Sequence, residues 1–281
     1  MQNGGCRTHE SLIALEGRMR YLRLIGSFVR ASTQNELAYR ANFWISLLYA
    51  LLNLGTGVLG VVVLFSQVET VRGWDLPATL ALLGVYLIIG ALRNLFIGPS
   101  LNALAGLDGE IWAGKFDFTL LRPVDTQFLA SLRYWRPLAL VDLVLGLGVL
   151  GAAVIRLEQS LTLPRLVAFL VAMGAGVTIL YAILLAFTAL FLWSPGFLFT
   201  WAFDAVFQMA RYPVGLYPGW LRLVLTWVIP VGVMTTVPAQ ALAGGLSAGT
   251  LIGSVALAVG LLFGASALFR LGLRRYTSAS S

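Results

Sequence analysis

Long apolar segments alternate with short polar connections along most of this 281-residue chain. Residues 42–65 carry no charged side chain. A helix rises about 1.5 Å per residue, so this segment is long enough to cross a hydrocarbon core of about 30 Å. The pattern predicts an all-α integral membrane protein with six transmembrane helices. The transmembrane domain is predicted at 41–275, with spans at about 42–65, 78–98, 138–155, 165–192, 196–213 and 247–269.

The course of residues 194–242 is open between two interpretations, because this segment contains five prolines. Proline removes a backbone donor and ends or kinks helices. In the first interpretation, a cytoplasmic interfacial stretch precedes a span at 221–239. In the second, the span at 196–213 precedes two extracellular half-helices within 219–242, which dip into the membrane and turn back. Both interpretations give six spans and leave the C-terminus on the same side.

The N-terminal region is basic and amphipathic. Apolar residues recur at helical spacing within residues 19–40, among arginines that include Arg20, Arg23 and Arg30. This pattern predicts a helix that lies at an anionic cytoplasmic headgroup surface. The alternative is a solvated helical leader without a role. Residues 1–18 are polar and are predicted to be a disordered tail or an extension upstream of the true start.

The composition agrees with a membrane protein. Hydrophobic residues make up 59% of the chain and charged residues 11%, whereas soluble domains carry about 25% charged residues. This excludes a soluble enzyme, a nucleic-acid-binding domain and a disordered chain. Cys6 and His9 are the single cysteine and histidine, which excludes disulfide frameworks, Cys/His zinc sites and Ser–His–Asp triads. We expect no metal or cofactor to be bound by this chain.

The net charge of +7 comes from basic residues whose positions indicate how the chain is oriented in the membrane. Basic residues gather before residue 41, between 93 and 137 and after 269, and they are sparse in the other connections. Cytoplasmic loops of membrane proteins are enriched in lysine and arginine. The distribution therefore predicts a multi-pass protein of a bacterial inner membrane with both termini in the cytoplasm.

The longest polar stretch, residues 99–137, combines charges of both signs with large apolar side chains. Protein-docking surfaces combine aromatic and charged groups in this way, so we expect a docking loop. Gly109 to Lys115 also fits most of a phosphate-binding loop, but Phe116 stands where serine or threonine would ligate magnesium. No strand is predicted before it, so the chain is not expected to hydrolyse ATP.

Three segments resemble the ABC-2 class of ATP-binding-cassette transporter permeases, in its bacterial six-span branch. They are LAYRANFW at 37–44, GKFDFTLLRPVDTQFLASLR at 114–133 and the proline-rich 212–242. The third segment resembles the paired extracellular half-helices of that class, which favours the second interpretation of 194–242. The resemblance covers nearly the whole chain from Met19 and implies the type V ABC exporter fold.

The resemblance implies that two permease chains, identical or paralogous, form the pore above two ABC ATPase subunits, which bind ATP and Mg²⁺. The loop between the second and third spans is implied to sit in a groove of the ATPase, with the N-terminal helix beside it. The alternative is that the LLRPVD core only turns the chain at the headgroup level. The implied coupling positions are Leu107, Asp108, Glu110, Lys115, Phe116, Asp117, Leu121, Arg122, Pro123 and Asp125.

Polar groups inside spans are costly and indicate functional positions. Arg93 and Asp142 lie at similar depth on adjacent predicted spans, so we expect an ion pair between them. Asp204, Gln208 and Arg211 share one helical face. This face is predicted either to line a substrate path or to neutralise an arginine of a neighbouring chain. If Asp204 faces the path, a cationic apolar substrate would suit it.

The last span carries a stripe of small residues. Small residues at helical spacing allow close approach of helices in membranes, so we expect this stripe to pack in the core. The stripe consists of Gly249, Gly253, Gly260 and Gly264.

These observations favour a permease subunit of an ABC exporter. Its expected substrate is amphipathic, such as a drug, an antibiotic or a lipid. The first alternative is a secondary transporter or channel, which would need relays of buried carboxylates or histidines that the spans lack. The second is an integral membrane enzyme acting on lipids, for which the carboxylates of 99–137 are the only candidates. The expected partners are the lipid bilayer, the two ATPase subunits and a second permease chain, with no nucleic acid.

Overall fold

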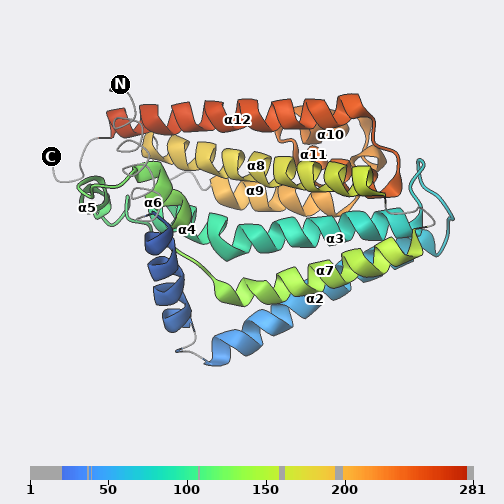
Figure 1. Ribbon diagram of the computed structural model, residues 1–281, viewed down its shortest axis with the longest axis horizontal. Helices are drawn as coiled ribbons and strands as arrows, with labels where there is room; N and C mark the ends of the chain where they lie inside the picture. Colours follow the sequence, from blue (N-terminus) through green and yellow to red (C-terminus); the bar gives the residue numbers. More distant parts are fainter. Residues whose placement is uncertain are drawn as a thin grey trace, which may run out of the picture.

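The computed structural model describes residues 21–36, 38, 40–106, 108–157, 162–193 and 199–276, and these residues form an all-helical bundle (Figure 1). The predicted tail at 1–18, Arg20 and Leu107 lie outside the described residues. The all-α prediction is confirmed for the described part of the chain.

Among the described residues, five helical segments are long and apolar enough to cross a membrane, or six if one bent helix pair counts as a span. The first is α2 (Arg40–Phe65). The second joins α3 (Leu76–Leu92) through a π-helical turn, η1 (Arg93–Ile97), to α4 (Gly98–Ala105). The third comprises η2 (Pro137–Ala139) and α7 (Leu140–Arg156). The others are α8 (Leu163–Trp193) and α12 (Ala248–Arg275).

Polar caps at one end of the bundle set where two of these helices begin. The Asp75 carboxylate accepts a hydrogen bond from the Ala78 backbone N–H at 2.8 Å, at the start of α3. The Ser247 hydroxyl accepts a hydrogen bond from the Thr250 backbone N–H at 3.1 Å, at the start of α12. Each cap satisfies a donor that the helix cannot satisfy internally.

Close contacts at glycine residues show the relative directions of the packed helices. Gly84 of α3 lies against Leu150 of α7, and Gly146 of α7 lies against Ile88 of α3, so these two helices are antiparallel. Gly272, near the end of α12, lies against Leu192, near the end of α8, so these two are parallel. The chain therefore crosses the bundle between the end of α8 and the start of α12.

The Gly84 contact predicts a severe packing defect on substitution. A Cβ atom on Gly84 would lie 2.8 Å from the Leu150 backbone nitrogen, which cannot move without separating α3 from α7. Overpacking of this kind costs about 1–3 kcal/mol. We expect Gly84→Leu to lower the midpoint of thermal unfolding in detergent. Gly151→Leu on α7 is the control, because nothing lies within 4 Å of its Cβ position; equal midpoints for the two variants would contradict this packing.

The return crossing begins with α9 (Phe199–Gln208) and η3 (Met209–Arg211), followed by η4 (Val214–Leu216). Arg72, in the connection between α2 and α3, donates a hydrogen bond to the Gly215 carbonyl at 2.5 Å. Gly215 therefore lies at the end of the bundle where α3 begins, and the chain completes the crossing before this residue.

Two bent helices then precede α12. They are α10 (Gly219–Leu223), continued by η5 (Val224–Val228), and α11 (Val231–Ala243), with a 90° bend between them. Pro230 lies at this bend and has no backbone N–H to continue the first helix. The segment 221–239 of the first interpretation is therefore bent, and the pair forms either a broken span or a re-entrant loop. Figure 1 shows both helices toward the end of the bundle opposite to α4, α5 and α6.

The N-terminal helix, residues 21–36, runs across the ends of the other helices (Figure 1). Its partly buried positions recur at helical spacing, whereas Arg23 and Arg30 are exposed. The Glu36 carboxylate accepts a hydrogen bond from the Leu138 backbone N–H at 3.1 Å, and Tyr21 packs edge-on against Phe128 at 4.8 Å. This helix is therefore attached to the segment that leads into α7 and to the polar loop.

The glycine stripe of α12 does not pack in the core of this chain, contrary to the expectation. Its four positions are exposed, and a Cβ atom on three of them would meet nothing within 4 Å. The opposite face packs on α8 instead, through Ala258, Ala265, Phe269 and Gly272. Helical spacing alone identified a face, and the neighbouring helix settled which face was buried.

Candidate functional site

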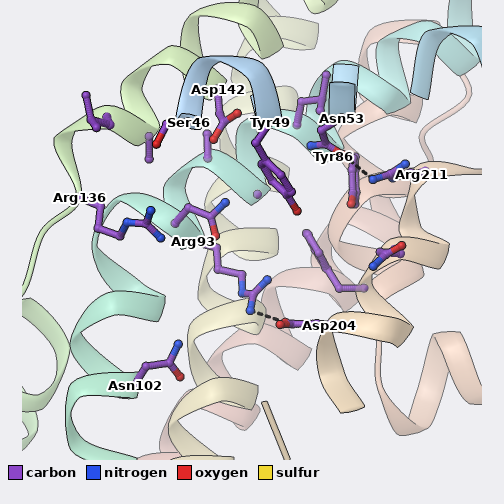
Figure 2. Close-up of a pocket in the computed structure, with 18 of the residues that line it drawn as sticks. Ser46, Tyr49, Asn53, Tyr86, Arg93, Asn102, Arg136, Asp142, Asp204 and Arg211 are labelled. Carbon is purple, nitrogen blue, oxygen red and sulfur yellow. Dashed lines mark hydrogen bonds and ion pairs between the residues drawn. The ribbon is translucent and has the colours of Figure 1, made fainter. Parts of the chain in front are cut away.

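A cavity of about 550 Å³ lies between α2, α3, η1, α7 and α9 (Figure 2). Its walls are partly apolar, with Ile45, Leu87 and Phe207 among the lining side chains. All five intramembrane polar residues singled out from the sequence line this one cavity. They are Arg93, Asp142, Asp204, Gln208 and Arg211.

Arg93 forms an ion pair with Asp204 of α9 rather than with Asp142, so the predicted pairing is wrong. The reason is the rotation of the helix. Ile88 of α3 faces α7, and Arg93 is five residues further on, about 140° around the helix at 100° per residue. Its side chain therefore points to α9, where it lies over the Phe203 ring at 5.8 Å.

The Arg93 side chain is largely buried, so its charge depends on the ion pair with Asp204. The Arg93 side chain is 14% exposed, whereas the Asp204 side chain is 42% exposed toward the cavity. A guanidinium withdrawn from water needs a counter-charge. The pair neutralises Asp204, which removes the reason to expect a cationic substrate.

Arg211 links the return crossing to α2. Its guanidinium donates a hydrogen bond to the Asn53 side-chain carbonyl and lies 5.3 Å from the centre of the Tyr86 ring. Within the described residues, no carboxylate forms an ion pair with Arg211. An amide and an aromatic face together hold a positive charge at this wall of the cavity. The sequence signal that was missed is Asn53, an amide in the middle of an apolar run.

Asp142 lies on the α7 wall of the same cavity (Figure 2). It forms no ion pair in the part of the chain that the structure describes. Arg136 is directed toward the N-terminal helix, with its Nε atom 3.8 Å from a Glu36 oxygen. The exposed Gln208 adds an amide to the lining. The cavity thus combines apolar walls with polar groups that can bind a polar ligand group.

The polar loop folds around its own charged residues. It contains α5 (Phe116–Leu120) and α6 (Thr126–Leu132). Glu110 accepts hydrogen bonds from Arg133 and Thr119, both at 2.5 Å. Phe116 is fully buried and meets Tyr276 edge-on at 5.1 Å. Glu110 and Phe116 therefore hold the loop together and do not face outward, as a docking role would require. The sequence did not point to Arg133, because its hydrogen-bond partner, Glu110, lies 23 residues earlier in the chain.

Two more loop carboxylates have internal contacts. Asp125 caps α6 by accepting a hydrogen bond from the Phe128 backbone N–H at 2.8 Å. Asp117 lies beside Tyr276, just beyond the end of α12, where burial and this carboxylate both raise the pKa of the tyrosine. A negative neighbour disfavours the phenolate. The contact between Asp117 and Tyr276 connects the loop to the C-terminal end of the last helix.

The tip of the loop is exposed, and we define it as Lys115, Phe118, Leu121, Arg122 and Pro123. Phe118 is 69% exposed and Leu121 is 81% exposed. Two large apolar side chains with so much accessible surface, flanked by two cations, are typical of a protein-docking patch. Asp108 is also exposed, near this tip in sequence.

The chain was compared with known proteins. A family model described as ABC-2 family transporter protein matches residues 51–280. The comparison with curated proteins found no match. The matched range contains the whole polar loop and every cavity residue discussed above except Ile45.

Proposed function

Because the chain belongs to the family of ABC-2 transporter proteins, we propose that it is the permease subunit of an ABC exporter. The family match confirms the resemblance seen in the sequence, and the chain is a multi-pass membrane component of a transporter. Proteins of this family normally work with ABC ATPase subunits. In our proposal, two such subunits bind ATP and Mg²⁺, and this chain binds neither.

The observation that carries the proposal is the cavity beside Arg93 and Asp204. It brings apolar side chains and a band of polar groups together within the predicted spans. A substrate that combines apolar surface with polar groups would match such a lining. We therefore propose an amphipathic substrate, such as a drug, an antibiotic or a lipid, exported from the cytoplasm or the inner leaflet.

The loop tip supports the proposed attachment to an ATPase. In Figure 1, α5 lies at the extreme end of the bundle, beyond the ends of the long helices. Phe118 and Leu121 are available there to enter a groove, and Lys115 and Arg122 to set its register by charge. The N-terminal helix lies beside the loop and, in this proposal, rests on the cytoplasmic headgroups of a bacterial inner membrane, with both termini in the cytoplasm.

A second permease chain is proposed to complete the pathway. Much of the α2 surface remains uncovered in this chain, with Trp44 and Tyr49 both 67% exposed. The cavity lies partly against this helix, through Ser46 and Asn53 (Figure 2). On this topology, α10 and α11 are the half-helices that enter the membrane from the extracellular side.

Reconstitution tests the proposal. We expect affinity purification of the full chain from its native membranes to recover an ABC ATPase, and the complex in liposomes to accumulate an amphipathic substrate only with ATP. The chain without the ATPase should show neither ATP hydrolysis nor transport. Proton- or sodium-driven movement by the chain alone would instead identify a secondary transporter, and turnover of a lipid without ATP would identify an enzyme.

A further inference from the structure

A second cavity, of about 600 Å³, lies between η1, α6, α8 and α12, away from the cavity that contains Arg93. Its α12 wall consists of Leu262, Ser266 and Arg270, which are spaced four residues apart along one face. At about 1.5 Å per residue, the wall extends roughly 12 Å along the helix. Since Arg270 is near the basic end of α12, the groove runs from the proposed cytoplasmic headgroup level into the inner leaflet.

The walls of this groove change from apolar to polar along its length. Along α12 the lining passes from Leu262 through Ser266 to Arg270. Val177 of α8, Phe96 and Ile97 add apolar side chains to the lining. Gln127 of α6 donates hydrogen bonds to Ser266 at 3.0 Å and to the Tyr181 hydroxyl at 3.3 Å. These bonds bind the loop helix α6 to both α8 and α12 in the floor of the groove.

Two opposite charges line the groove without forming an ion pair with each other. Arg270 is exposed, and in the described part of the chain no carboxylate pairs with it. Asp125 also lines the groove, and its cap bond to Phe128 fixes the position of its carboxylate. A guanidinium and a separate carboxylate above apolar walls are complementary to a zwitterionic amphiphile.

We propose that this groove binds a zwitterionic phospholipid of the cytoplasmic leaflet that carries a primary ammonium group, as phosphatidylethanolamine does. Arg270 binds the phosphate, because arginine forms strong charge-assisted hydrogen bonds to phosphate oxygens. Asp125 binds the ammonium group, and an acyl chain lies on Val177 and Leu262. The bound lipid then braces α6, and with it the docking loop, against α8 and α12.

Native mass spectrometry of the full chain, without any ATPase, tests the proposal. The chain is purified with phosphatidylethanolamine, phosphatidylcholine or phosphatidylglycerol of matched acyl chains. We expect at least tenfold greater retention of phosphatidylethanolamine than of the other two lipids, since phosphatidylcholine cannot donate hydrogen bonds and phosphatidylglycerol has no cation. We expect Arg270→Gln to lower phosphatidylethanolamine retention about tenfold, and Arg274→Gln, exposed on the same helix outside the groove, to leave it unchanged.

Asp125→Asn distinguishes the ammonium contact from a plain phosphate site. Asparagine is as good a helix cap as aspartate, so the fold of α6 is retained while the charge is lost. We expect this variant to lose the preference for phosphatidylethanolamine over phosphatidylglycerol. Equal retention of all three lipids by the unmodified chain, or an undiminished preference in Asp125→Asn, would overturn the proposal. Ser266→Leu, which fills the groove, should also displace the lipid; unchanged retention in this variant would place the lipid elsewhere.

Discussion

The Leu121→Asp variant is expected to lose the proposed ATPase partner while remaining folded. Leu121 is 81% exposed in this chain, and surface substitutions usually change the free energy of unfolding by less than about 0.5 kcal/mol. If the side chain is buried in an ATPase groove, placing a carboxylate there removes an anchor worth about 2 kcal/mol or more. That corresponds to a loss of affinity of about 30-fold or more.

The measurement is recovery of the ABC ATPase with the tagged permease, together with its thermal unfolding midpoint. Val68→Asp is the matched control, since Val68 is an exposed apolar residue in the connection between α2 and α3, at the opposite end of the bundle. We expect the control to retain the partner. Full recovery of the ATPase by Leu121→Asp would exclude the loop tip as the docking site.

Removing the carboxylate of Asp204 is expected to destabilise the bundle, because it leaves Arg93 buried without its counter-charge. Removing one partner of a fully buried ion pair costs about 3–5 kcal/mol. The cost here should be lower, about 2–3 kcal/mol, because Asp204 is partly exposed to the cavity. We therefore expect Asp204→Asn to lower the thermal unfolding midpoint in detergent.

The double variant Asp204→Asn with Arg93→Gln separates charge from packing. It removes both charges, so we expect it to recover most of the lost stability. Asp142→Asn is the control in the same cavity, because Asp142 forms no ion pair within the described residues. If Asp142→Asn destabilises the chain as much as Asp204→Asn does, the loss comes from the cavity lining in general and not from the ion pair.

The sequence alone identified five polar residues of the cavity, but it missed Asn53 and did not give the partners of those five. A polar group within an apolar run must face protein or water, so the polarity of Arg93, Asp142, Asp204 and Arg211 was enough to place them away from lipid. Their pairing depended on the rotation of α3 and on the position of α9. The same holds for Glu110, whose charge suggested a partner protein although the structure directs it to Arg133.

The long helices were determined by the sequence, because a long apolar run with few charged residues is a local property that the bilayer requires. The 90° bend at Pro230 was likewise suggested by proline chemistry. Only the tertiary structure decided which face of each helix is buried. It turned the glycine stripe of α12 outward and directed Arg93 to α9. Apolar helices in a membrane carry little pattern that distinguishes lipid from protein, so the choice of neighbour comes from packing.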